Sequence, residues 1–222
     1  MSAKKSYALL CPIARALDFL GDRWALLILR ELHAGPGRFS DLRAALPGLA
    51  ANLLTTRLAE LAEAGLLARD GERRGARYVL TDLGRATRPV LFELARFGAQ
   101  LPMPERISEP GNRRHVAVTL AAAAERAAPP GLSLRAEIVI DGQAFSFVVA
   151  RGAVSMEAGA MLAPPLRYEA RYETLAPVVA GAMPFSAHLA QHARIECFDG
   201  TDPAPFLHLI ADALDIIGGR RA

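Results

Sequence analysis

The sequence predicts an α+β protein with a mainly helical N-terminal part and a smaller C-terminal part built on a largely antiparallel sheet. Apolar residues recur at helical spacing through most of residues 1–100, whereas alternating strands and sharp turns dominate residues 113–222. Between them, residues 101–112 contain three prolines and one glycine without either period, which is typical of a linker. At 222 residues, two domains are the expected number.

Composition excludes several classes. With 52% hydrophobic and 22% charged residues the chain is expected to fold, and it lacks the run of roughly 18 apolar residues that a membrane span needs. No export signal is recognisable, and two cysteines suit a reducing compartment, so we expect a cytoplasmic protein without membrane contact. Residues 1–106 carry a net charge of +5 and the remainder −2, so an acidic partner would bind the N-terminal part.

The N-terminal part shows the order helix, turn, helix, hairpin. Amphipathic helices are expected at 12–20 and 24–32, a third at 41–46 capped by Ser40, and a fourth at 50–64. Two short strands, 66–70 and 76–80, flank a basic hairpin, and a helix from Thr81 to about residue 99 follows, kinked at Pro89. This order predicts a winged helix-turn-helix domain.

Such domains place the second helix of the motif in the major groove of double-stranded DNA. On the helix that starts near residue 50, the side chains expected to face DNA are Asn52, Thr55, Thr56 and Arg57. Phosphate contacts are expected from Arg38, Ser40 and Arg43 on the preceding helix and from Arg73, Arg74 and Arg77 on the wing. Any one of these side chains, taken alone, could equally be a solvated surface residue.

The residues also resemble a family. Cys11-Pro12, Gly21 to Trp24, Arg38 to Leu42, Leu53 to Leu58 and Tyr78 to Thr81 are similar to the run that marks HxlR-type winged helix-turn-helix regulators, over about residues 9–99. The resemblance implies a bacterial or archaeal transcription factor, a repressor by our prediction, that binds an inverted repeat as a homodimer. It further implies a dimer interface made by the N-terminal helix and the helix from Thr81. The compact wing, 70–75, and Asp22 depart from the family pattern.

Cys11 precedes a proline at the first helical position, where free amides and the helix dipole stabilise a thiolate. Some regulators of this kind sense oxidants through a cysteine so placed, so the resemblance implies a redox switch at Cys11. The alternative is a buried structural cysteine at the dimer interface. Cys197, inside an apolar strand, is expected to be a core residue.

The C-terminal part is expected to hold a helix at 114–127, four strands at 132–140, 144–150, 154–157 and 166–172, helices at 175–182 and 186–191, a strand at 194–198 and a helix at 204–217. Its small residues and spacing resemble a sterol-carrier-protein-type domain, which implies a site for an apolar small-molecule effector. The candidate lining residues are Phe145, Phe147, Val149, Met156, Met161, Leu166, Met183 and Phe185, which could instead be core.

Catalysis has little support in the sequence. His188 and His192 have the four-residue spacing of helical metal ligands but lack a third ligand, so core or solvated histidines are favoured. We therefore expect a non-enzyme without metal or cofactor. The leading hypothesis is a homodimeric regulator in which effector and DNA affinities are linked. The alternative is a lipid or small-molecule carrier that uses its winged helix only to dimerise.

Overall fold

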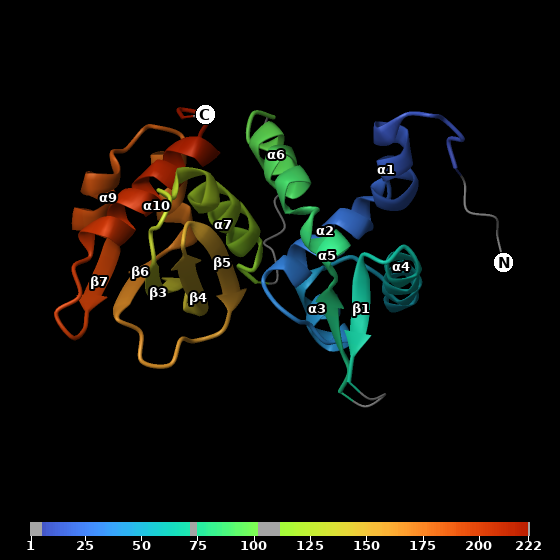
Figure 1. Cartoon of the computed structure of the whole chain (residues 1–222), viewed down its shortest axis with the longest axis horizontal. Coiled ribbons are helices and arrows are strands. Elements are labelled where there is room, and N and C mark those ends of the chain that lie inside the picture. Colours follow the sequence, from blue (N-terminus) through green and yellow to red (C-terminus); the bar gives the residue numbers. More distant parts are fainter. Residues whose placement is uncertain (1–5, 72–74, 102–111, 222) are drawn as a thin grey trace. The chain divides into compact units, whose positions relative to one another are not determined.

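The computed structural model describes residues 6–71, 75–101 and 112–221 (Figure 1). Its contacts divide the chain into two compact units, an N-terminal unit that runs to Arg88 and a C-terminal unit that starts at Pro89. The predicted boundaries, 1–100, 101–112 and 113–222, differ from this division in the placement of residues 89–100. Residues 102–111, most of the predicted linker, lie outside the described residues.

The N-terminal unit contains five of the helices and a two-stranded sheet. In chain order these are α1 (Pro12–Leu20), α2 (Arg23–His33), α3 (Phe39–Ala45), α4 (Ala51–Glu63), β1 (Leu67–Asp70), β2 (Arg77–Leu80) and α5 (Asp82–Arg85). The order helix, turn, helix, hairpin is therefore confirmed, and α1 begins and ends at the predicted residues. The core of the unit lies between α2 and α4, whose apolar side chains, including Ile28, Leu54 and Leu58, are buried.

The two strands form the predicted hairpin, and one further residue extends it. β1 and β2 pair antiparallel, with Leu67 opposite Leu80 and Asp70 opposite Arg77. Tyr78 also exchanges backbone hydrogen bonds with Gly37, at 2.8 and 3.1 Å, in the segment between α2 and α3. The hairpin is thereby attached to the helices by backbone pairing as well as by its buried leucines.

The chain turns sharply from β2 into α5. The Thr81 hydroxyl accepts a hydrogen bond from the Gly84 amide and donates one to the Gly65 carbonyl, so Thr81 caps the helix as predicted. A Cβ at position 84 would come within 1.9 Å of the Leu66 carbonyl oxygen, and only glycine permits this approach. Thr81 and Gly84 together seat α5 on the start of β1.

The predicted single helix from Thr81 to residue 99 is wrong, because the chain breaks between α5 and α6 (Arg88–Gly98). Pro89 is the second residue of α6, a position a helix tolerates, whereas a continuous helix would need its missing N–H and would clash with the Arg85 carbonyl. Past the break, α6 packs with α7 (His115–Ala127) in the C-terminal unit. The Arg126 guanidinium lies 4.4 Å from the centre of the Phe92 ring and 2.8 Å from the Glu93 carboxylate.

The remaining elements match the predicted order. They are β3 (Leu134–Ile140), β4 (Gln143–Ala150), β5 (Ala153–Ala158), β6 (Leu166–Ala170), α8 (Tyr172–Val179), α9 (Phe185–His192), β7 (Ala193–Cys197) and α10 (Ala204–Ile217). The sheet has the order β5-β4-β3-β6-β7, in which only β3 and β6 run parallel. A mixed but mainly antiparallel sheet is therefore present.

One face of this sheet carries the core of the C-terminal unit. The paired residues Ile138 and Phe145, and next to them Phe147 and Met156, point to the same face and are buried. Helices α7 and α10 pack together against that face, and the Phe147 ring meets Phe206 of α10 edge to face (Figure 1). On the opposite face, Arg and Glu side chains of β3, β6 and β7 lie opposite one another, for example Glu137 opposite Arg167 and Glu169 opposite Arg194, while β4 contributes small and apolar side chains.

Two tight turns fix the register of the meander. Asp141 and Gly142 have φ of 49° and 78°, and Arg151 and Gly152 have 52° and 85°. Two consecutive residues in the left-handed region make the turn whose twist matches a two-residue hairpin. Both turns are where the sequence predicts them. Within the described residues, no helix is long and apolar enough to span a membrane.

Candidate nucleic-acid interface

Helix α4 presents a polar stripe on one side and leucines on the other. Asn52, Thr55 and Thr56 are exposed, whereas Leu54 and Leu58 are at most 2% exposed. Successive residues of a helix are rotated by about 100°, so Asn52, Thr55 and Thr56 fall within about 100° of one another on the solvent side. The structure therefore brings three of the four predicted base-contacting residues together.

The stripe keeps hydrogen-bonding capacity for a ligand. The Thr55 and Thr56 hydroxyls donate to the carbonyls of Ala51 and Asn52, at 3.0 and 3.1 Å, and so retain their acceptor lone pairs. The Asn52 side-chain oxygen accepts the Leu53 amide at 2.9 Å. Donors from the Asn52 amide and acceptors from the threonines are the groups that base edges can pair with.

Arg57 does not join this stripe. It lies about 140° around the helix from Asn52, and its side chain is 25% exposed. Its guanidinium is bound by two carboxylates, with 2.9 Å to Asp22 Oδ2 and 2.5 Å to Glu60 Oε2. In this geometry Arg57 pairs with carboxylates away from the stripe, and its reading of bases stays a prediction. The spacing of the helix could have shown this, because position 57 belongs to the same side as Leu54 and Leu61.

Helix α3 precedes α4 in the chain. Of the three residues predicted to contact phosphates there, Ser40 and Arg43 lie within the helix and Arg38 is its N-cap. Arg38 and Arg43 are exposed, as is Ser40. Ser40 is not the cap of this helix, because the helix begins at Phe39. Arg38 holds the N-cap position instead, and its amide donates to the Asp41 carboxylate at 2.9 Å. The Ser40 hydroxyl lies 3.3 Å from the same carboxylate.

The wing contributes Arg77, which is exposed at the start of β2. Arg73 and Arg74 lie outside the described residues. Arg69, which the sequence reasoning did not select, is exposed on β1 opposite Tyr78. A further overlooked basic group is Arg23, exposed at the start of α2 with its guanidinium 5.3 Å from the centre of the Trp24 ring. Basic residues in short strands and first helical turns are the signal that could have identified both.

Two helices expose apolar side chains that their own unit does not cover. In and before α1, the exposed apolar residues are Tyr7, Leu9, Leu10, Ile13, Leu17 and Phe19, and only Ala14 of the helix is buried. On and after α6, the exposed apolar residues are Val90, Leu94, Phe97 and Leu101. Such surfaces are typical of protein–protein contacts. They lie on the two regions that the resemblance assigns to the dimer interface.

Cys11 occupies the N-cap position of α1, with Pro12 at the first helical position as expected. Its side chain is partly exposed and makes no capping hydrogen bond. Cys197 is exposed at the end of β7, so its expected place in the core is wrong. The reason is topological, since β7 is the edge strand of the sheet and Cys197 is its last residue.

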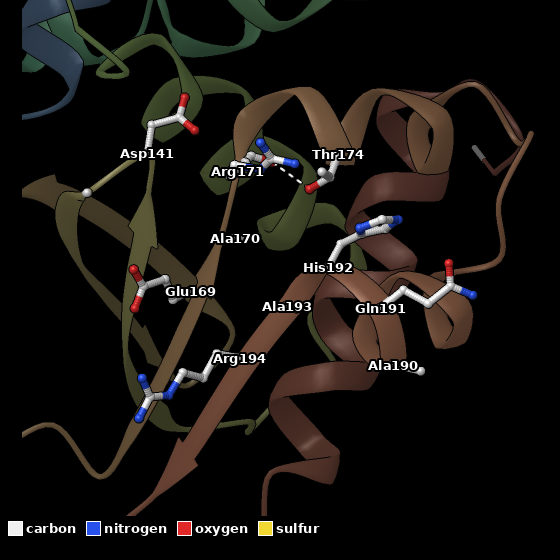
Figure 2. A pocket seen from close by; sticks show the side chains of 11 residues that line it. Asp141, Glu169, Ala170, Arg171, Thr174, Ala190, Gln191, His192, Ala193 and Arg194 are labelled. Atoms are coloured by element: carbon white, nitrogen blue, oxygen red, sulfur yellow. Dashed lines mark hydrogen bonds between the residues drawn. The ribbon is translucent and has the colours of Figure 1, made fainter.

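The predicted ligand-contacting residues are mainly core. Phe145, Phe147, Val149, Met156, Met161 and Leu166 are 0–8% exposed, and Met183 and Phe185 are partly exposed. A pocket of about 570 Å³ does exist in the C-terminal unit (Figure 2), but none of these eight residues lines it. The alternative given above, that this set forms the core, holds for the six buried residues, because inward-facing strand residues fill the space under α7 and α10.

Most of the residues that line the pocket in Figure 2 are charged or polar, and the others are alanines and a glycine. The pocket lies where the Asp141-Gly142 turn, the start of α8 and the end of α9 meet. Arg113 donates to Asp141 at 2.5 Å, Arg171 pairs with Glu173 at 2.9 Å, and Arg194 pairs with Glu196 at 2.6 Å. Burial raises the pKa of Asp141, but hydrogen bonds from Arg113 and the Tyr172 amide outweigh it and hold the pKa below its usual value. Two acidic and two basic side chains line the pocket, so the charges around it do not indicate whether a ligand would be an anion or a cation.

His188 is a core histidine, completely buried, whereas His192 is exposed. The Nδ1 atom of His188 lies 3.1 Å from the Thr174 carbonyl oxygen. Because a carbonyl can only accept a hydrogen bond, Nδ1 of His188 carries the proton. Nε2, at 2.8 Å from the Tyr168 hydroxyl, then accepts from it. Burial lowers the pKa of His188 and raises that of Tyr168. Among the described residues, no three His, Cys, Asp or Glu side chains lie close enough to hold a metal ion.

A helix-turn-helix with an exposed polar stripe on its second helix, followed by a two-stranded wing, defines a winged helix-turn-helix DNA-binding domain. The family model for the HxlR-like helix-turn-helix matches residues 19–106. The chain belongs to this family and is a DNA-binding transcriptional regulator. The match ends at residue 106, so the sterol-carrier-like character of residues 113–222 stays a prediction.

The relatives are regulators of the same kind. The HTH-type transcriptional regulator sll1512 of Synechocystis is 38% identical over 40% of this chain and 69% of its own length. YvaP of Bacillus subtilis, also an HTH-type transcriptional regulator, is 38% identical over 41% of this chain and 88% of its own length. The reduced form of the regulator YodB from B. subtilis is 29% identical, covers 44% of this chain and 100% of its own, and has a TM-score of 0.38. That score is too low for the likeness to add to the assignment.

Proposed function

We propose that this chain is a homodimeric repressor that reads an inverted-repeat operator through α4. Asn52, Thr55 and Thr56 face base edges in the major groove, and Arg38, Arg43 and Arg77 contact phosphates on either side. The observation that carries the proposal is the stripe itself. Three exposed hydrogen-bonding side chains share one side of a helix whose other side carries buried leucines.

The dimer rests on the apolar surface of α1. In the single chain the Ile13 side chain is 72% exposed, and that of Leu10, just before the helix, is fully exposed. Burying apolar area against a second copy removes it from water at roughly 25 cal/mol per Å². A two-fold dimer presents two copies of α4, which meet half-sites about one helical turn, roughly 34 Å, apart.

The experiment is selection of bound sequences from random duplex DNA by the purified full chain at two salt concentrations. An inverted repeat whose affinity falls steeply with salt supports the proposal, because phosphate contacts release counterions. Asn52→Ala should weaken operator binding by about 1–3 kcal/mol and relax the preference at one base pair. Gln191→Ala, the same amide lost from α9, is the matched control and should change nothing.

The rival hypothesis is a carrier of lipid or small molecules. Its proposed apolar site loses support because six of the eight residues assigned to it are core. Recovery of no sequence motif at either salt concentration, together with lipid co-purifying with the chain, would overturn the regulator and favour the carrier. An effector bound by the C-terminal unit and a redox response of Cys11 stay predictions.

A further inference from the structure

Asp22 lies in the turn between α1 and α2 and uses its two carboxylate oxygens for different helices. Oδ1 accepts the Trp24 amide at 2.9 Å, which caps the N-terminus of α2. Oδ2 accepts from the Arg57 guanidinium of α4, also at 2.9 Å. One side chain thus joins the first turn of α2 to the middle of the helix that carries the polar stripe.

Arg57 completes the connection from the other side. While one terminal nitrogen binds Asp22, the other binds Glu60 one turn along α4 at 2.5 Å. The three side chains are between 25% and 41% exposed, so they are neither fully solvated nor sealed in the core. A planar guanidinium held at two nitrogens has a defined orientation, which an ammonium group would lack.

The leucines under α4 do not by themselves fix its rotation. The contacts that the buried side chains of Leu54, Leu58 and Leu61 make with the core are less directional than hydrogen bonds, so they define the rotation of the helix about its axis less sharply. The hydrogen bond from Arg57 to Asp22 is directional and opposes such a rotation, whereas the bond to Glu60, on the same helix, fixes the orientation of the guanidinium. Trp24, next in the cap, also lies near the turn before α4, where a Cβ at Gly48 would be 3.9 Å from its ring.

We propose that Asp22 is a positioning residue, which sets the rotation of α4 through Arg57 and thereby aims Asn52, Thr55 and Thr56 at the bases. The inference rests on the proposed function, because it assigns no DNA contact to Asp22 or Arg57. It adds that specificity depends on a carboxylate outside the helix-turn-helix stripe. It also assigns Arg57 a role as an intermediary between helices.

The test is a double-mutant cycle on the full chain, using the operator selected above. Asp22→Asn keeps a side-chain oxygen that can cap α2 but removes the negative charge that pairs with Arg57. Arg57→Gln removes the guanidinium group that binds Asp22 and Glu60. Both should weaken operator binding about tenfold, with the double variant no weaker than either single one, because they remove the same connection. The ratio of specific to non-specific affinity falls, whereas the salt slope stays that of the parent.

A matched control separates positioning from loss of negative charge near DNA. Glu63→Gln neutralises an exposed carboxylate at the end of the same helix, and should leave the ratio of specific to non-specific affinity unchanged. Thermal unfolding followed by Trp24 fluorescence shows whether each variant is folded. Arg57→Lys keeps the positive charge but not the planar guanidinium group. It should recover less than half of the operator affinity that Arg57→Gln loses.

Three results would overturn the proposal. A salt slope reduced by about one in Arg57→Gln would make Arg57 a phosphate contact, and a preference changed at one base pair would make it a base contact. Additive losses in the double variant would show that Asp22 does not act through Arg57. If the parent protein selects no operator, both the proposed function and the positioning role fail. If the losses of the two single variants add in the double variant but the parent still selects an operator that Asn52→Ala weakens, only the positioning role fails.

Discussion

Helices α1 and α7 are both rich in apolar residues but have opposite surroundings. α1 has one buried residue, Ala14, and exposes Ile13 and Leu17. α7 buries eight of its 13 residues, because the sheet covers one side and α10 another. Amphipathic spacing alone therefore says that a helix has an apolar face, and not whether the same chain covers it.

The difference separates two uses of apolar area. In the C-terminal unit that area is buried within the chain and stabilises the fold, whereas on α1 it is exposed in the single chain and is the surface proposed above for contact with a second copy. The first kind of residue should affect unfolding and not assembly, and the second kind should affect assembly and not unfolding. The following experiments test this separation.

The largest effect is expected from Phe147→Ala in the C-terminal core. Phe147 is completely buried against Phe206, so its truncation should lower the free energy of unfolding by about 3–5 kcal/mol. Chemical denaturation followed by circular dichroism measures the loss. Leu162→Ala, at a side chain that is 91% exposed, is the control and should cost less than about 0.5 kcal/mol. Equal losses in the two variants would contradict the assignment of Phe147 to the core.

A loss of similar size is expected in the N-terminal unit on acidification. Burial, with smaller contributions from Arg88 and Arg85, lowers the pKa of His33 to about 4. Because this folded-state pKa lies below the unfolded value of 6.5, the stability is complete above about pH 6.5. It should fall by about 3 kcal/mol as the pH drops to about 4.

Trp24, the only tryptophan, reports unfolding of the N-terminal unit alone. In His33→Gln, whose amide can donate to Thr87 at the 3.0 Å contact of the imidazole, this dependence should flatten over the same pH range. A His33→Gln profile as steep as that of the parent would assign the acid sensitivity to other groups.

A smaller change in free energy is expected for the surface of α1. Ile13→Glu should weaken the dimer by about 2 kcal/mol, roughly thirtyfold, because it places a charge in the apolar contact. The unfolding of the dissociated chain should hardly change, since Ile13 is exposed. Sedimentation equilibrium measures the dissociation constant. A dimer as tight as the parent would exclude the surface of α1 from the interface.

The smallest effect on stability is expected at Cys11. Cys11→Ser should change neither folding nor operator affinity under reducing conditions by more than about twofold, yet it should abolish any loss of affinity caused by a mild oxidant. Cys197→Ser, at the other exposed thiol, should respond to oxidant as the parent does. A response retained in Cys11→Ser and lost in Cys197→Ser would transfer the switch to β7.

Local rules predicted most of the fold. Asp141-Gly142 and Arg151-Gly152 are predicted as turns because the glycine in second place accepts a left-handed conformation, and α10 has the predicted bounds because nothing interrupts its period. The failures have different origins. The exposure of Cys197 depends on which elements lie alongside, which is not local information, whereas the break before Pro89 has a local signal in the proline itself, from which the sequence predicted only a kink.

The candidate site was predicted in the same uneven way. The stripe of Asn52, Thr55 and Thr56 follows from helical spacing and is present. Arg57 was assigned to it by residue type, although its position on the helix places it beside the leucines. The partnership with Asp22 spans 35 residues of sequence, and no local pattern predicts it.

The break between α5 and α6 bears on how the chain can be divided. α6 lies inside the stretch that matches the family, yet it packs with the C-terminal unit, and Arg126 of α7 covers the Phe92 ring. A fragment cut in the proline-rich stretch would keep α6 and lose α7. In such a fragment Phe92 would become exposed to water, in addition to Val90, Leu94 and Phe97. Because this enlarges the apolar surface of α6, the fragment should aggregate. Among the described residues the boundary between the two units therefore lies at Pro89, and the natural place for a cut is ahead of this residue instead of after residue 101.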